Sequence, residues 1–189
     1  MLRIDALRSV YPSLEQGLVV TNMGAVAVEL YSLGHRPNFF YLEHSMGLAS
    51  SVGLGLALSL PNERTVVFDG DASVLMNLGT FSTIGRYQPG NLVHVVFDNE
   101  SLLSVGGFPS ATSTGTNLAG IASEAGIHHS ALVTDVEQFK DEFELALKRD
   151  EPSVIVAKVD AVGPTSFIMD IGLLENRFEF ERHIKELGD

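Results

Sequence analysis

The chain has 189 residues, of which 45% are hydrophobic, so it is long and apolar enough to form one domain with a buried core rather than a disordered chain. Its formal net charge of −12 argues against nucleic acid as a partner, because binding to a phosphate backbone requires basic patches and none is visible. There is no cysteine, no signal-peptide pattern and no apolar run long enough to span a bilayer, so we expect a cytoplasmic protein without disulfides or membrane contact.

Apolar runs separated by turn residues predict strands that alternate with helices along the chain. We expect a strand at 18–21, a helix at 25–33, a strand at 39–42, a helix at 46–60, a strand at 65–68, a helix at 74–86 and a strand at 92–97. A loop rich in Gly, Ser and Thr follows from 98 to about 116, and then a helix at 118–125, a strand at 131–133, a helix at 136–148, a strand at 154–159 and a charged helix at about 175–187.

Three of the predicted strands, 65–68, 92–97 and 154–159, are apolar throughout. Continuous apolar strands are typical of a parallel sheet that is covered on both faces. We therefore expect a single α/β domain over residues 1–189, with a doubly wound, mostly parallel sheet and helices on both faces. Three glycines inside the predicted helix 46–60 lower its helix propensity, which indicates close packing or a nearby ligand.

Two of these apolar strands end in polar residues that suit a metal ion. One strand runs into Asp69, Gly70 and Asp71, and the next runs into Asp98 and Asn99. In a parallel sheet the carboxyl ends of neighbouring strands lie side by side, and ligands bind there. The carboxylate of Asp71 and the amide oxygen of Asn99 are ligands that Mg²⁺ prefers, so we expect a magnesium site at this edge.

An anion site is expected beside the metal. Gly70 lets the backbone approach a ligand closely, and the amide groups near Ala72 and Ser73 point at an anion. Taken alone, an Asp-Gly pair or an Asn after a strand is most often only a turn or a cap. Here the two turns flank one strand–helix–strand unit, with 25 residues between Ala72 and Asp98, and this pairing favours a site for a metal-bound diphosphate.

The segment "GDA", followed by 25 residues and "DN", resembles the glycine-aspartate-glycine to asparagine-asparagine motif of thiamine diphosphate enzymes. The stretches "EHSMGLASSVGLGLALSL" and "DGDASVLMNLGTFSTIG" are similar to the β subunit of sulfopyruvate decarboxylase and to the matching half of phosphonopyruvate decarboxylase. The resemblance covers roughly residues 15–160 and joins three separate segments in the right order. It implies the thiamine diphosphate-binding fold.

The resemblance also implies a role for individual residues. Asp71, the side chain of Asn99 and the main-chain oxygen of Ser101 would bind Mg²⁺. Cofactor contacts would come from Thr21, Asn22, His44, Ser45, Met46, Gly70, Asp71, Ala72, Ser73, Asn99, Ser101 and Leu102. Met46 would hold the two cofactor rings in a bent shape, although a methionine here is otherwise a core residue. The main-chain oxygen of His44 would bind the aminopyrimidine, and its side chain is a candidate proton donor.

Two kinds of departure from the family pattern bear on function. Ala72 stands where the motif has its second glycine, Asp98 stands where it has its first asparagine, and the loop from Leu102 to Phe108 is more apolar than is expected of sulfopyruvate decarboxylases. In addition, the family activates its cofactor with a glutamate on a second, pyrimidine-binding domain, and this chain has about the length of the diphosphate-binding half alone. That glutamate is therefore expected from a separate α subunit.

These observations together favour the diphosphate-binding subunit of a two-subunit, thiamine diphosphate- and Mg²⁺-dependent 2-oxo acid decarboxylase of the sulfopyruvate or phosphonopyruvate type. Its partners would be a pyrimidine-binding α subunit, which supplies the activating glutamate, and a small 2-oxo acid substrate, and we expect a dimer of heterodimers or a larger assembly. The alternatives are an acetolactate synthase-like carboligase subunit and a non-catalytic, cofactor-binding partner subunit. A nucleotide-binding Rossmann module fits less well, because no glycine-rich turn follows the first predicted strand.

Overall fold

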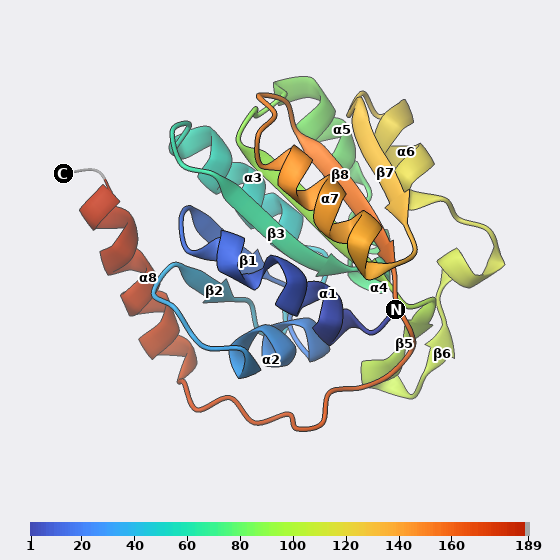
Figure 1. The fold of residues 1–189 in the computed structure, drawn as a ribbon, viewed down its shortest axis with the longest axis horizontal. Helices are drawn as coiled ribbons and strands as arrows, with labels where there is room; N and C mark the ends of the chain where they lie inside the picture. The colour runs from blue at the N-terminus through green and yellow to red at the C-terminus, as the bar shows by residue number, and fades with distance from the viewer. Residues whose placement is uncertain (188–189) are drawn as a thin grey trace.

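The computed structural model describes residues 1–187 and contains a six-stranded parallel sheet with the order β2-β1-β3-β4-β8-β7 (Figure 1). The strands are β1 (Leu18–Thr21), β2 (Phe39–Tyr41), β3 (Thr65–Gly70), β4 (Leu92–Asp98), β7 (His129–Val133) and β8 (Ser153–Lys158). The register places Gly70 at the end of β3 beside Phe97 of β4, so the polar residues that follow these two strands emerge next to each other.

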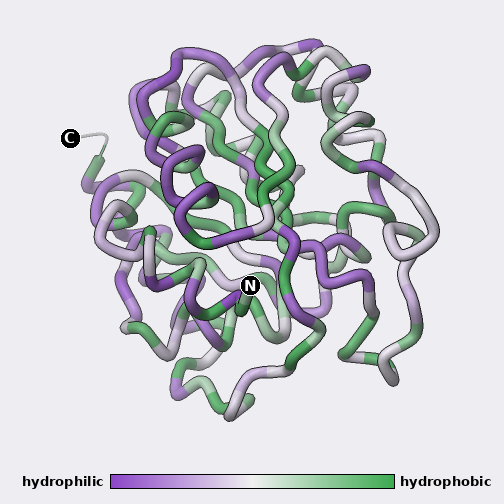
Figure 2. Tube along the Cα trace, turned by 45° about the vertical axis from the view of Figure 1, so that its right-hand side comes forward, coloured by the Kyte–Doolittle hydropathy of each residue, from purple (hydrophilic) through white to green (hydrophobic). Residues whose placement is uncertain are grey.

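Helices cover both faces of the sheet, which confirms the predicted doubly wound fold class. One face carries α1 (Arg3–Val10), α2 (Ala25–Ser32) and α7 (Val136–Ala146), whose buried side chains form one hydrophobic cluster with the sheet. The other face carries α3 (Ala49–Ser59), α4 (Asp71–Leu75), α5 (Gly79–Tyr87) and α6 (Leu118–Glu124), which form a second cluster. Figure 2 shows the hydrophobic stretches gathered along the middle of the molecule, between these two layers.

The last helix, α8 (Leu173–Leu187), lies beside the edge strand β2 rather than on a face of the sheet (Figure 1). A long segment without regular structure, 159–172, leads to it from the end of β8. The rings of Phe40 and Phe180 stack with their centroids 5.2 Å apart, which joins the helix to the strand. No helix within residues 1–187 combines the length and the apolar character that are needed to cross a membrane.

Two of the predicted helices were wrong in detail. The helix expected from residue 46 begins at Ala49, because Gly47 adopts a positive φ of 83° in a turn that precedes it. The helix expected over 74–86 is two helices, α4 and α5, and between them the side chain of Asn77 donates a hydrogen bond to the Gly47 carbonyl at 2.8 Å. Asn77 thus ties the segment between α4 and α5 to the turn before α3.

The loop expected over 98–116 contains a short antiparallel hairpin, β5 (Ser101–Leu102) with β6 (Phe108–Pro109), and two 3₁₀ turns, Leu103–Val105 and Ala111–Thr114. Helix α1 was not predicted. The two glycines inside α3 differ in their surroundings. A Cβ on Gly53 would collide with Val67 of β3, whereas a Cβ on Gly55 would meet nothing within 4 Å. Close packing of α3 on the sheet thus explains Gly53.

Candidate cofactor site

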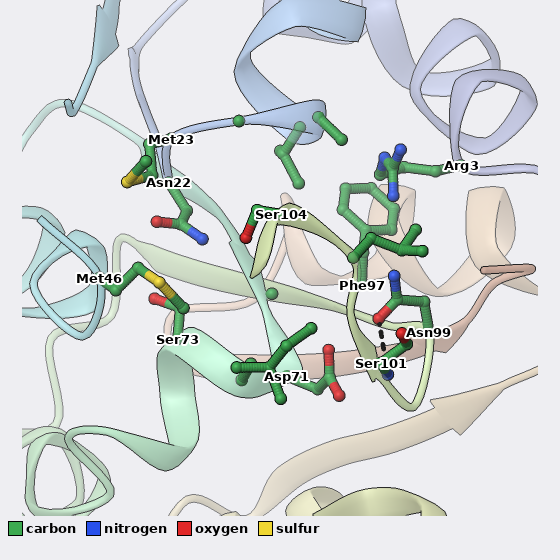
Figure 3. A pocket seen from close by; sticks show the side chains of 17 residues that line it. Arg3, Asn22, Met23, Met46, Asp71, Ser73, Phe97, Asn99, Ser101 and Ser104 are labelled. Atoms are coloured by element: carbon green, nitrogen blue, oxygen red, sulfur yellow. Dashed lines mark hydrogen bonds between the residues drawn. The ribbon is translucent and has the colours of Figure 1, made fainter. Parts of the chain in front are cut away.

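A cavity of about 90 Å³ lies at the carboxyl ends of β1, β3 and β4 (Figure 3). Its lining residues come from five places: the start of α1, the β1–α2 turn with the first residues of α2, the turn before α3, the end of β3 with the residues after it, and the end of β4 with the residues after it. They are Arg3, Asn22, Met23, Gly24, Ala25, Val26, Met46, Gly70, Asp71, Ala72, Ser73, Phe97, Asn99, Ser101, Leu102, Leu103 and Ser104. This is the edge of a parallel sheet at which ligands bind.

Nine of the twelve predicted site residues line this cavity: Asn22, Met46, Gly70, Asp71, Ala72, Ser73, Asn99, Ser101 and Leu102. The other three do not. Thr21 is fully buried in β1, Ser45 donates its hydroxyl to the Glu43 carbonyl at 2.8 Å, and the His44 side chain is 85% exposed. His44 also has a positive φ of 51°. The roles predicted for these three residues therefore find no support from cavity lining, and they stay predictions.

The Asp71 carboxylate is buried at the centre of a hydroxyl network. Its Oδ2 atom accepts a hydrogen bond from the Ser110 hydroxyl at 2.5 Å, and it lies 3.1 Å from the Thr112 hydroxyl. The Thr112 hydroxyl also contacts Oδ1 of Asp98 at 2.7 Å, and the Ser110 and Thr112 hydroxyl oxygens are 2.8 Å apart. Asp98 has its own counterion, because Oδ2 of Asp98 lies 2.8 Å from Nζ of Lys158.

When both carboxyl groups are ionised, this network has fewer hydroxyl protons than short oxygen–oxygen contacts. Ser110 and Thr112 each carry one hydroxyl proton, and four short contacts join the two hydroxyls to each other and to the carboxylates. Burial raises the pKa of Asp71 above its usual range, and the negative charge of Asp98 raises it further, while the hydroxyls and the Ala72 amide lower it. A cation at this position would favour the ionised form.

Asn99 and Ser101 face Asp71 from the neighbouring strand end (Figure 3). The Ser101 amide donates a hydrogen bond to Oδ1 of Asn99 at 3.1 Å, which holds the asparagine side chain over its own turn. An amide oxygen has two lone pairs, so this bond leaves it able to accept a second partner. Residues 1–187 contain no group of three or more His, Cys, Asp or Glu side chains placed to hold a metal, so a cation here would depend on asparagine and main-chain oxygens besides Asp71.

Met46 is held against the cavity by hydrogen bonds to the residue that follows it. The Gly47 amide donates to Oγ of Ser73 at 2.9 Å, and the Gly47 carbonyl accepts from Nδ2 of Asn77 at 2.8 Å. A Cβ on Gly47 would approach Met76 and Asn77 at 3.2 and 3.3 Å, so this tight, positive-φ turn suits glycine. The turn brings the thioether of Met46 beside Ser73, as Figure 3 shows.

Sequence reasoning missed several residues of the site. Ser110 and Thr112 lie in what was expected to be an irregular loop, and only their hydroxyl-rich context hinted at a polar role. Arg3 was missed because α1 was not predicted at all. Met23 and Gly24 follow a predicted strand directly, which is the signal that could have identified them.

The donor set fits a metal-bound diphosphate cofactor. Asp71 and Asn99 supply hard oxygen atoms, and Gly70, Ala72 and Ser73 line the same cavity, where the Gly70 amide itself donates to Oδ1 of Asp69 at 2.9 Å. The buried Oδ1 atom of Asn22 has no hydrogen-bond partner among the described residues, although buried polar atoms are nearly always paired. A diphosphate has only acceptor oxygens, so the group of Asn22 that suits it is the side-chain NH₂ and not this oxygen.

Comparison with known proteins decides the family. The model of the thiamine pyrophosphate enzyme, C-terminal TPP binding domain, matches residues 20–157 of the chain. The chain belongs to this family. Thiamine pyrophosphate is the same compound as thiamine diphosphate, so the family match agrees with the resemblance carried by the two strand-end motifs.

Individual relatives agree with the family assignment. The chain is 37% identical over 184 residues to the sulfopyruvate decarboxylase subunit beta of Methanocaldococcus jannaschii, and the match covers 97% of each chain. It is 39% identical over 154 residues to the phosphonopyruvate decarboxylase of Streptomyces viridochromogenes, covering 81% of this chain and 38% of that protein. Among solved structures, benzoylformate decarboxylase from Polynucleobacter necessarius shares the fold, with a TM-score of 0.72 and 18% identity over 87% of this chain and 34% of that one.

Proposed function

We propose that this chain is the diphosphate-binding subunit of a two-subunit, thiamine diphosphate- and Mg²⁺-dependent 2-oxo acid decarboxylase of the sulfopyruvate or phosphonopyruvate type, acting in the cytoplasm. The observation that carries the proposal is the meeting of Asp71 and Asn99 in one cavity, at the ends of adjacent strands, within a domain of the thiamine pyrophosphate enzyme family. Relatives of nearly the same length are named as β subunits of sulfopyruvate decarboxylase.

Different residues of the cavity would contact different parts of the cofactor. Asp71, the Asn99 side chain and the Ser101 main-chain oxygen would bind Mg²⁺, and Gly70, Ala72 and Ser73 would contact the diphosphate. Asn22 would reach the cofactor from the β1–α2 turn, where its side-chain N–H groups can donate to a diphosphate oxygen. Met46, fixed through Gly47, would support the bent arrangement of the two rings.

When bound, thiamine diphosphate supplies the electron sink for loss of CO₂ from a 2-oxo acid. Activation of the cofactor requires a glutamate, and the cavity lining within residues 1–187 contains none. We therefore propose that a pyrimidine-binding α subunit supplies it. The word "beta" in the names of the relatives supports a partner of this kind.

The loop after the metal turn bears on the choice of substrate. Leu102, Leu103 and Ser104 line the cavity, whereas the side chains of Val105 and Phe108 are 58% and 65% exposed. The apolar side chains at the tip of the loop thus do not build the wall of this cavity, and they are free to contact the α subunit. Donors for a sulfonate or phosphonate group would then come from main-chain amides or from that subunit.

Reconstitution tests the proposal. The chain, produced alone and together with the protein encoded next to it, is assayed for CO₂ release from sulfopyruvate, phosphonopyruvate, pyruvate and an aromatic 2-oxo acid with Mg²⁺ and thiamine diphosphate. We expect negligible activity alone and activity in the complex. Robust turnover by the isolated chain would contradict the two-subunit assignment. Formation of acetolactate from pyruvate would favour a carboligase, and cofactor binding without any turnover would favour a non-catalytic subunit.

A further inference from the structure

Arg3 lies at the start of α1, far in sequence from every motif of the cofactor site, yet it lines the cavity. Its side chain is 5% exposed. Among the lining residues it is the one with a permanent positive charge, and Asp71 is the one with a carboxylate. Figure 3 shows the Arg3 side chain reaching toward the cavity next to the ring of Phe97, on the side where Asn99 lies.

Two of the three guanidinium nitrogens of Arg3 have partners. The Nε and Nη2 atoms donate to the two carboxylate oxygens of Glu29 at 2.8 and 3.0 Å, and Nη2 also donates to the Val162 carbonyl at 3.2 Å. A guanidinium has five N–H donors, and these contacts use three of them. The two donors on Nη1 have no hydrogen-bond partner within residues 1–187.

The fork with Glu29 holds the guanidinium in one orientation. Glu29 is buried on α2, the helix whose first turn also lines the cavity. The start of α1, where Arg3 lies, is held by a hydrogen bond from the Asp160 amide to the Met1 carbonyl at 2.9 Å. A planar guanidinium that is fixed along one edge presents its remaining donors in a set direction, which suits a bidentate or charge-assisted contact with a phosphate oxygen. Nη1 is not among the buried atoms without a hydrogen-bond partner in the described part of the chain, so its donors are open to a ligand.

We propose that Nη1 of Arg3 binds the diphosphate group of the cofactor, as a second cationic contact besides the metal. This inference rests on the proposed function, because it takes thiamine diphosphate as the ligand. A diphosphate carries more negative charge than one Mg²⁺ neutralises, and Asp71 adds another negative charge to the same cavity. Glu29 binds the Nε and Nη2 edge of the Arg3 guanidinium, so the Nη1 donors stay available to the ligand.

The experiment measures binding of Mg²⁺–thiamine diphosphate and of Mg²⁺–pyrophosphate to the full chain by calorimetry, alone and with the partner subunit. Arg3→Gln should weaken both ligands about tenfold to a hundredfold, the range for a lost charge-assisted hydrogen bond. Arg3→Lys should recover part of the affinity, because it keeps the charge and loses the fork. The matched control is Arg8→Gln on the same helix, where the arginine is 62% exposed and pairs with Asp5; it should leave both affinities unchanged.

Loss of Arg3 leaves the buried Glu29 carboxylate without its counterion, which lowers the stability of the folded chain. The double variant Arg3→Gln/Glu29→Gln removes both charges, so no buried charge is left unpaired and the same loss of affinity is expected in a folded background. Unchanged affinity for both ligands in a folded Arg3 variant would overturn the inference and leave the proposed function standing. Absence of binding by the unaltered chain, alone and in the complex, would overturn the proposed cofactor site and this inference with it.

Discussion

Asp71 and Asp98 are two buried carboxyl groups from neighbouring strand ends that share one hydroxyl group, that of Thr112. The Thr112 oxygen lies 3.1 Å from Oδ2 of Asp71 and 2.7 Å from Oδ1 of Asp98. A hydroxyl has one proton and cannot donate to both groups at once. The shorter contact favours donation to Asp98. The Asp71 carboxylate therefore relies on the Ser110 hydroxyl, and on any ligand bound in the cavity, for its partners.

Removing the shared hydroxyl should destabilise the fold. Thr112→Val keeps the shape of the side chain and removes the hydrogen bond to a buried carboxylate, so we expect a loss of about 1–3 kcal/mol in the free energy of unfolding. Urea denaturation of the ligand-free chain measures it. Thr114→Val makes the same change at an exposed position of the same turn, and its effect should stay within about 0.5 kcal/mol. Equal effects of the two substitutions would contradict the network.

The raised pKa of Asp71 predicts a pH-dependent stability of the ligand-free chain. Because the folded-state pKa lies above the unfolded value, the contribution to stability is fully present below the usual aspartate range and is lost as the pH rises through the raised pKa. Asp71→Asn removes this titration. At neutral pH the ligand-free variant should therefore have a higher Tm than the parent chain, and the difference should shrink toward acidic pH.

The same substitution should abolish Mg²⁺-dependent binding of thiamine diphosphate, because the amide cannot replace the carboxylate charge. Thermal unfolding across a pH series and calorimetric titration measure the two effects on one preparation. A variant that binds the cofactor with the parent affinity would remove Asp71 from the metal site. A variant that is less stable at neutral pH would show that burial does not govern this carboxyl group.

Gly47 should be sensitive to a single methyl group. Gly47→Ala forces an L-residue into a positive φ and brings its Cβ within 3.2 Å of Met76, so we expect a loss of about 1–3 kcal/mol and weaker cofactor binding through displacement of Met46. Gly55→Ala is the control, because a Cβ there meets nothing within 4 Å and the residue lies in a helix. It should stabilise the chain by roughly 0.5–1 kcal/mol. Denaturation midpoints and calorimetric affinities test both variants, and a neutral Gly47→Ala would contradict the argument.

Asn176 should hold α8 on the edge of the sheet. The Tyr41 amide donates to its Oδ1 at 3.0 Å, and its Nδ2 donates to the Phe39 carbonyl at 2.7 Å, so one side chain pairs the edge strand as a neighbouring strand would. Asn176→Leu leaves both backbone groups unpaired and should cost about 1–3 kcal/mol. Hydrogen exchange at Tyr41 should become faster. Leu174→Ala, on the exposed side of the same helix, should leave that exchange rate unchanged.

Much of the fold could be predicted because its signals are local. The strands around 18–21, 65–68 and 92–97 were predicted from continuous apolar runs, and each agrees with the structure to within two residues at either end. Burial on both faces of a parallel sheet requires such runs, so the pattern indicated both the strands and the layers that cover them. Asp71 and Asn99 were found in the same way, since each directly follows one of these strands.

The sequence by itself therefore determined the alternating order of elements, the covered parallel sheet and the strand-end polar residues, because all three follow from neighbours along the chain. Tertiary structure decided which distant residues complete the site. Ser110 and Thr112 reach Asp71 across 39 and 41 residues, and Arg3 reaches Glu29 across 26. The segment between α4 and α5 likewise makes a bond from Asn77 to Gly47, across 30 residues. No local pattern encodes these contacts, because they exist only after the layers have packed.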